Sequence, residues 1–274
     1  MSFDVELVGK IGSMALVNSE YRDMDYNTIA RLSRELRPGY IWVTSGAVEI
    51  GRLDYVKRNG KELNGDTENN KADYSAQGQA ILMNTYREYI DSRYSIRQIL
   101  VEHQHFNDEV KRAHVKDMLL RCVMQNAIPI VNYNDAVSME EIRNLEICKL
   151  KEKNAKVVQC VDNDETASQI ACLVRAETLL ILTVTKGIYA IPSDEKTLIP
   201  EIRGKDIYEL LENVDACRDS CEGKSRAGTG GAKSKLEYIK EPLKLGTKVI
   251  IASSRYSIKD ILSGKAPRTF IGIG

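Results

Sequence analysis

Short apolar runs alternate along this chain with longer stretches in which apolar residues recur at helical spacing. Strands are predicted at 3–8, 40–44, 96–101, 128–132, 157–161, 178–184, 248–252 and 269–273. Helices are predicted at 26–36, 75–94, 110–125, 165–176, 205–212 and 231–245. This alternation favours a mostly parallel sheet with helices on both faces, a three-layer α/β/α sandwich. The run 178–184 is the most apolar and is expected near the middle of the sheet.

Two polar stretches interrupt the alternation. Residues 51–73 are rich in Asn and Gly and are interpreted as a mobile excursion, in which 53–70 could form a lid or an oligomer contact. Residues 139–154 are charged and irregular in pattern, which indicates an elaboration on the surface. Asp164 is a plausible N-cap for the helix predicted to follow it.

Charge and cysteine content narrow the function classes. The 274 residues carry 39 basic and 39 acidic side chains, so net charge gives no case for nucleic acid or an anionic membrane. The first residues lack a signal-peptide pattern, and no apolar run is long enough to span a bilayer. The irregular spacing of the six cysteines is typical of reduced core thiols, so a cytoplasmic location is expected.

Polar and glycine-containing segments follow several predicted strands, where ligands of parallel sheets bind. Gly9–Ser13 contains Lys10 between two glycines, which suits phosphate binding, although a solvated lysine on a turn is the plain alternative. Thr44–Val48 places small residues at a strand-to-helix junction, where a helix N-terminus can bind an anion. Tight packing of strand against helix would explain the same residues.

Two further segments offer amides and carboxylates. Asn132–Asp135 could bind the ammonium and carboxylate groups of an amino acid, or could be a polar turn. Asp162–Asp164 places two carboxylates so close that a lysine or Mg²⁺ should compensate them, unless one simply caps a helix.

A glycine-rich loop, Gly228–Lys235, leads into the helix predicted at 231–245. Lysine in a first helical turn opposes the helix dipole and therefore suggests an anionic partner such as a polyphosphate. The loop is not a Walker A motif, because no glycine stands directly before Lys233.

A structural zinc site is less favoured. His103 and His105, and likewise Cys217 and Cys221, have loose ligand-like spacing but no evident further ligands in the sequence.

These motifs, in this order over about residues 3 to 272, resemble the amino acid kinase family and, within it, the glutamate 5-kinases. The matching stretches are Lys10–Ser13, Thr44–Val48 with Gly51, Gly78 and Gln79, Leu82 and Met83 with Tyr86, Gln98–Leu100, Ile128–Ile130, Asn132 with Asn134 and Asp135, Asp162–Asp164, and Gly228–Gly231 with Lys235. The resemblance implies ATP-dependent phosphorylation of the side-chain carboxylate of glutamate to γ-glutamyl phosphate, the first step of proline biosynthesis. ATP and Mg²⁺ are the implied cofactors.

The resemblance also assigns roles to residues. Lys10 and Lys235 would stabilise the phosphoryl group in transfer, and Asp164 would hold the two lysines in place. The residues implied in substrate binding are Ser45, Gly46, Ala47, Asn132, Asp135 and Asn163. Those implied in ATP binding are Lys10, Gly12, Ser13, Thr183, Thr229, Gly230, Gly231 and Lys235. No metal ligand is implied among the side chains, apart from Asp162 as a possible contact of Mg²⁺ on the ATP phosphates.

The family resemblance further implies one domain over residues 1–274, in which about 1–155 bind the acceptor and about 156–274 bind the nucleotide. A homodimer or homotetramer is expected, with handover of the product to a reductase. Feedback inhibition by proline is plausible on the same ground. The C-terminal PUA domain that many glutamate 5-kinases carry is expected to be missing, and no nucleic-acid or membrane partner is expected.

Two positions depart from the family pattern. Tyr133 stands where members usually carry Glu, and Val184 stands where they usually carry Asp. Tyr133 favours a kinase acting on another small acceptor, such as another amino acid, a carbamate or a phosphate ester. Val184 favours a non-catalytic protein that senses an amino acid or a nucleotide. The presence of Lys10, Asp164 and Lys235 together argues against this alternative.

Overall fold

The computed structural model describes residues 2–153, 157–160, 162–191, 194–221 and 231–274. Within these ranges eight strands form one sheet, and β5 (Ser95–Val101) is the strand at one of its edges. Next to it in the sheet come β6 (Ala127–Tyr133), β4 (Tyr40–Val43), β1 (Val5–Ile11), β7 (Ala176–Thr183), β11 (Lys248–Ser253), β12 (Arg268–Ile273) and β10 (Glu201–Gly204). The strands from β5 to β11 are parallel, whereas β12 runs antiparallel to β11 and β10 parallel to β12.

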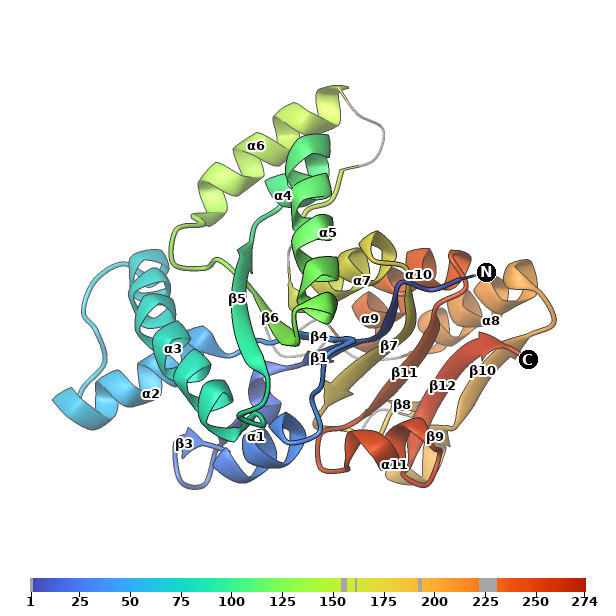
Figure 1. Ribbon diagram of the computed structural model, residues 1–274, viewed down its shortest axis with the longest axis horizontal. Coiled ribbons are helices and arrows are strands. Elements are labelled where there is room, and N and C mark those ends of the chain that lie inside the picture. Colours follow the sequence, from blue (N-terminus) through green and yellow to red (C-terminus); the bar gives the residue numbers. More distant parts are fainter. Residues whose placement is uncertain (1, 154–156, 161, 192–193, 222–230) are drawn as a thin grey trace.

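Helices cover both faces of this sheet, as the alternating pattern predicted (Figure 1). One face carries a core cluster with side chains of α5 (Glu109–Met124), α7 (Asn163–Leu173), α8 (Ile207–Ser220), α9 (Ala232–Tyr238) and α10 (Lys240–Lys244). The opposite face carries α1 (Tyr26–Ser33), α2 (Ala47–Asn59), α3 (Thr67–Tyr89) and α11 (Ile258–Leu262). The three-layer α/β/α sandwich is therefore confirmed, and β7 lies between β1 and β11, inside the sheet.

Short elements complete the described chain. Two small hairpins are formed by β2 (Val17–Asn18) with β3 (Asp23–Met24) and by β8 (Ile188–Tyr189) with β9 (Leu198–Ile199). The remaining elements are α4 (Gln104–Asn107), α6 (Glu140–Lys153) and the 3-10 turns η1 (Ser13–Ala15) and η2 (Glu195–Thr197). Most of α6 is exposed, in agreement with the predicted surface elaboration.

The predicted strand at 157–161 is wrong for its described residues, 157–160, which form no strand, and Val161 lies outside the described residues. The side chain of Asn107 replaces a strand partner instead. Its amide donates to the carbonyl of Val158 at 2.7 Å and accepts from the Val158 N–H at 2.9 Å.

Residues 51–73 do not interrupt the alternation as an irregular excursion, because α2 and α3 occupy most of this stretch; their role as a lid or an oligomer contact stays a prediction. Asp66 caps α3 by accepting from the N–H groups of Glu68 and Asn69. The Asn and Gly residues that suggested a loop belong chiefly to the ends of the two helices and to the connection between them.

The two helices cross where both carry glycine. A Cβ added at Gly51 would lie 1.8 Å from the Tyr74 carbonyl oxygen, and one added at Gly78 would lie 1.8 Å from that of Ala47. Both collisions are with backbone, so the helices would have to separate.

We therefore expect Gly78→Ala to lower the free energy of unfolding by about 3 kcal/mol, at the upper end of overpacking costs. Urea denaturation measures this change. Ala80→Leu is the matched control, because Ala80 is exposed on the same helix and should change stability by less than about 0.5 kcal/mol. Equal stability of Gly78→Ala and wild type would contradict the close crossing.

Candidate active site

Two lysines from distant parts of the chain meet at one buried carboxylate. Lys10 Nζ lies 2.6 Å from Asp164 Oδ1, and Lys235 Nζ lies 2.9 Å from Asp164 Oδ2. The side chain of Asp164 is 3% exposed, against 9% for Lys10 and 14% for Lys235. The three groups together carry a formal charge of +1 in a largely buried place. An excess positive charge of this kind is costly unless an anion joins it.

Electrostatics keep the central carboxylate ionised. Burial raises the pKa of Asp164, but the charges of Lys10 and Lys235 and their hydrogen bonds outweigh this effect. The net result is a pKa below the ordinary value. Both oxygens of Asp164 are therefore available to hold the two ammonium groups at neutral pH.

Local structure explains how these three side chains reach one another. Lys10 lies in β1, whose register places it beside Val43 of β4 and Ile181 of β7. Asp162, and not Asp164 as the sequence suggested, caps α7 by accepting from the N–H groups of Asp164 and Glu165. A different residue fills the cap, so the Asp164 side chain is free to contact the lysines.

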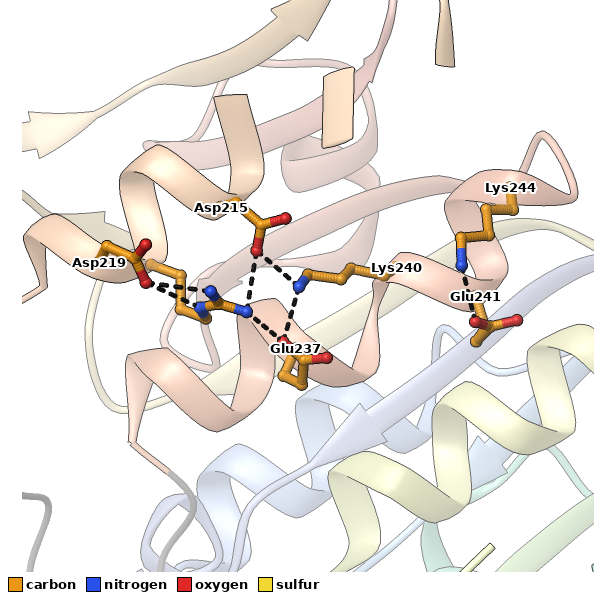
Figure 2. Close-up of polar contacts among 7 residues, drawn as sticks. Asp215, Asp219, Glu237, Lys240, Glu241 and Lys244 are labelled. Carbon is orange, nitrogen blue, oxygen red and sulfur yellow. Dashed lines mark hydrogen bonds and ion pairs between the residues drawn. The ribbon is translucent and has the colours of Figure 1, made fainter. Parts of the chain in front are cut away.

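Lys235 lies in α9, which ion pairs connect to α8 and α10. Arg218 and Lys240 both contact Asp215 and Glu237, at distances from 2.5 to 2.8 Å, and so join α8 to α9 and α10 (Figure 2). Each of these partly exposed ion pairs contributes little stability by itself, but a network restricts how the helices lie. These ion pairs therefore help to position the helix turn that carries Lys235.

The described residues do not form a metal cage. No cluster of three or more His, Cys, Asp or Glu side chains lies together among them. Burial, and next the charge of Asp164, raise the pKa of Asp162, and its Oδ1 is used as the helix cap. With both Asp164 oxygens on lysines, these carboxylates do not fit a magnesium ion held by protein side chains.

The small residues after β4 form an uncapped helix start. Gly46 is the N-cap of α2 with φ of 94°, a conformation that favours glycine. Because glycine has no side chain, Gly46 cannot accept hydrogen bonds from the first N–H groups of α2, as an Asp or Ser at this position would. Ser45 is buried beside them, and the N–H of Thr44 donates to the carbonyl of Val131 in β6. This strand end thus lies beside the end of β6.

Three side-chain amides form a connected chain at the end of β6. Asn132 donates through Nδ2 to Gln79 Oε1 at 2.8 Å, and Asn163 donates through Nδ2 to Asn132 Oδ1 at 3.2 Å. The N–H of Tyr133 donates to the same Asn132 oxygen at 2.9 Å. Asn163 directly precedes Asp164 in α7, so the amide chain leads toward the lysine cluster.

The unusual Tyr133 points to the opposite side of β6 from Asn132. Its ring belongs to the core cluster on the α5 and α7 face, whereas Ile130, on the same side of β6 as Asn132, belongs to the opposite cluster. Its hydroxyl pairs with Ser138 Oγ at 2.7 Å. Tyr133 is therefore a core residue of this chain, and a different acceptor stays the alternative that it suggested.

Asp135 lies near two cations contributed by other elements. Burial raises the pKa of Asp135 to about 6, against the opposing charges of Arg143 in α6 and Lys71 in α3. The carboxylate is consequently poised to gain or lose a proton close to neutral pH.

The residues expected to bind ATP are only partly described. Gly12, Ser13 and Thr183 lie where β1 and β7 end, and the N–H of Gly12 donates to the Leu182 carbonyl. Gly231 is the N-cap of α9. Val184 is 54% exposed directly after β7. Thr229 and Gly230 lie outside the described residues, so their predicted contacts stay a prediction.

Sequence reasoning missed some members of this site. Gln79 was noted only as part of a matching stretch, yet it is buried and bonded to Asn132. Arg143 and Lys71 were not singled out at all. The sequence does contain one indication of Gln79, because it directly follows Gly78. That glycine allows this turn of α3 to pack closely against the start of α2.

Comparison with known proteins agrees with this arrangement. The model of the "Amino acid kinase family" matches residues 6–253. Glutamate 5-kinase 1 of Bacillus licheniformis is 32% identical, over 97% of this chain and 68% of that protein. Glutamate 5-kinase of Clostridium perfringens is 28% identical, over 93% of this chain and 87% of that protein.

A solved structure supports the fold independently. Carbamate kinase from Giardia lamblia, bound to AMP-PNP, superposes with a TM-score of 0.59 at 15% identity and covers 98% of each chain. The match of the family model over most of the chain, together with the buried lysine–aspartate–lysine cluster, leads to one conclusion: this chain belongs to the amino acid kinase family.

Proposed function

We propose that this protein transfers the γ-phosphoryl group of ATP to the side-chain carboxylate of glutamate, giving γ-glutamyl phosphate and ADP. The observation that carries the proposal is the buried cluster of Lys10, Asp164 and Lys235 with its net positive charge. The transferred group passes through a metaphosphate-like state of charge about −1. A phosphoryl group of this charge would balance the net charge of +1 on the cluster.

The reaction needs positioning more than proton transfer. The glutamate side chain has a pKa of about 4.3, so its carboxylate is already an ionised nucleophile at neutral pH and no general base is required. One carboxylate oxygen forms a bond to the γ-phosphorus while the bond from that phosphorus to the β–γ bridging oxygen breaks. Lys10 and Lys235 then stabilise the charge spread over the moving phosphoryl oxygens.

The remaining side chains divide between the two substrates in this proposal. Ser45, Gly46 and Ala47 offer the uncapped start of α2 to a carboxylate. Asn132, Asn163 and Asp135 would bind the polar groups of the amino acid. Gly12, Ser13, Thr183 and the loop up to Gly231, with Thr229 and Gly230, would bind ATP. Mg²⁺ would be carried by the ATP phosphates, since the carboxylates described do not form a site of their own.

A wider setting is also proposed. Residues up to about 155 would bind the acceptor and those from about 156 the nucleotide. The acyl phosphate product is labile, so a reductase of proline biosynthesis would consume it. A cytoplasmic location and a homo-oligomer complete the proposal. All six cysteines are free in the described chain, and none of its helices is long and apolar enough to cross a membrane.

Release of ADP by the purified protein, measured with glutamate and with other acceptors, tests this function. Hydroxylamine should trap the product as a hydroxamate, which identifies an acyl phosphate. We expect release with glutamate. Release only with another amino acid, a carbamate or a phosphate ester would change the acceptor, and ligand binding without any release would indicate a sensor.

The raised pKa of Asp135 gives a prediction of pH dependence. The ordinary pKa of an aspartate is 3.8, and burial raises that of Asp135 to about 6 in the folded protein. The contribution of Asp135 to the stability of the fold is therefore lost as pH rises through 6. A bound ammonium group favours the ionised form. We therefore expect kcat/KM for glutamate to fall about tenfold per pH unit below pH 6.

The matched variant is Asp135→Asn, whose kcat/KM should be low and nearly independent of pH between 5 and 7. The KM for ATP in wild type serves as the internal control and should change little. An unaltered acid limb in Asp135→Asn would contradict the assignment.

A further inference from the structure

The amide chain Gln79–Asn132–Asn163 has a fixed direction. A backbone N–H can only donate, so the bond from Tyr133 N–H identifies the Asn132 atom that receives it as the oxygen. Asn132 must then present its NH₂ group on the other side, toward Gln79, and the Gln79 atom that accepts must also be an oxygen. One backbone group therefore sets the orientation of the neighbouring amides, which side-chain shape alone would leave open.

The ends of the chain are consequently different. Gln79 is left with its NH₂ group and Asn163 with its carbonyl oxygen. Gln79 Nε2 and Asn163 Oδ1 are both buried, and neither has a hydrogen-bond partner among the described residues. A buried polar atom without a partner costs about 1–3 kcal/mol, which a ligand would recover. The chain thus offers a donor at one end and an acceptor at the other.

The surroundings of each end match this polarity. Gln79 follows Gly78, which packs directly on Ala47 at the uncapped, anion-attracting start of α2. Asn163 Oδ1 is a buried acceptor, which only a hydrogen-bond donor can satisfy. A donor at the anion-attracting start of α2 therefore suits a carboxylate, and the free acceptor of Asn163 suits a donor such as an ammonium group.

We propose that Gln79 is a specificity-determining residue that binds the α-carboxylate of the acceptor through Nε2, while Asn163 Oδ1 accepts from its ammonium group. This inference rests on the proposed function. The reacting side chain must point to Lys10 and Lys235, which lie at the Asn163 end of the chain. The α-carbon and its carboxylate therefore extend along the amides toward Gln79.

Two substitutions at Gln79 distinguish recognition from support. In Gln79→Glu one new oxygen still accepts from Asn132, but the other places a negative charge where the donor stood. In Gln79→Met both interactions are lost. Recognition predicts that the Glu variant is worse than the Met variant, whereas a role limited to holding Asn132 predicts the reverse.

The experiment measures steady-state kinetics with glutamate and ATP at pH 8.5, where the new carboxyl group is ionised. We expect KM for glutamate to rise about 10–100-fold in Gln79→Met and further in Gln79→Glu. In Gln79→Met we expect kcat and the KM for ATP to stay within about threefold of wild type. Gln77→Met is the matched control, because the Gln77 side chain donates to Asp54 of α2 and not to the amide chain, and this variant should keep wild-type kinetics.

A KM for glutamate that is unchanged in Gln79→Met, or that is higher in Gln79→Met than in Gln79→Glu, would overturn the inference. Should Gln79→Glu not fold, Gln79→Met decides alone: kcat and both KM values deteriorating together would indicate structural support. Wild-type protein that releases no ADP with glutamate would instead reject the proposed function. The two failures are therefore separate.

Discussion

Replacing Lys235 by alanine is expected to lower kcat for phosphoryl transfer to glutamate about 10²–10³-fold while the protein stays folded. The loss should be large because this ammonium is mostly buried, where a charge interacts strongly with the developing phosphoryl charge. The fold should survive because Lys10 still pairs with Asp164 and the cluster becomes neutral. Lys10→Ala is expected to behave in the same way.

Steady-state ADP release measures this effect, with circular dichroism and thermal unfolding to confirm the fold. Lys244→Ala is the matched control, because Lys244 pairs with Glu241 on the surface and should keep wild-type kcat. A folded Lys235→Ala protein with near-normal kcat would remove this lysine from the mechanism.

Replacing Asp164 by asparagine is expected to be the most destabilising change in the site. It leaves two ammonium groups facing each other in a buried place, and removing one partner of a buried ion pair costs about 3–5 kcal/mol. We expect urea unfolding to show a loss of this size at pH 7, together with a fall in kcat of about 10²-fold or more.

Two controls make the Asp164 result specific. Adding Lys10→Met to Asp164→Asn removes one of the repelling charges and should restore part of the stability. Because the folded pKa of Asp164 lies below its ordinary value, its stabilisation is complete above pH 4 and is lost as pH falls further. Wild type and Asp164→Asn should therefore converge in stability in acid. Equal stability at pH 7 would contradict the charge cluster.

The sequence predicted the arrangement of layers because most strands are short apolar runs, and those runs do lie in the sheet. It failed at 157–160, where the apolar pattern is also that of a strand. The outcome there depended on the side chain of Asn107, about fifty residues away in the chain, which takes both backbone hydrogen bonds of Val158. The local pattern does not contain this information.

The candidate site was foreseeable to a similar extent. Lys10, Asp164 and Lys235 stood out because each follows a predicted strand or lies beside a glycine-rich segment, and the structure brings the three into contact. The N-cap was misplaced by two residues, because Asp162 and Asp164 are equivalent in sequence until Asp164 is seen to face two lysines. Gln79 lies in mid-helix, where the preceding Gly78 indicates a close helix crossing but not a site, and its contact with Asn132 is visible in the structure alone.

A crystal structure of the protein with a non-hydrolysable ATP analogue and glutamate tests the central claim most directly. The account predicts that the Nζ atoms of Lys10 and Lys235 both lie within about 3 Å of oxygens of the terminal phosphate, on opposite sides of it. A closed pocket with both ligands bound, but with either amine well beyond contact distance of that phosphate, would contradict it.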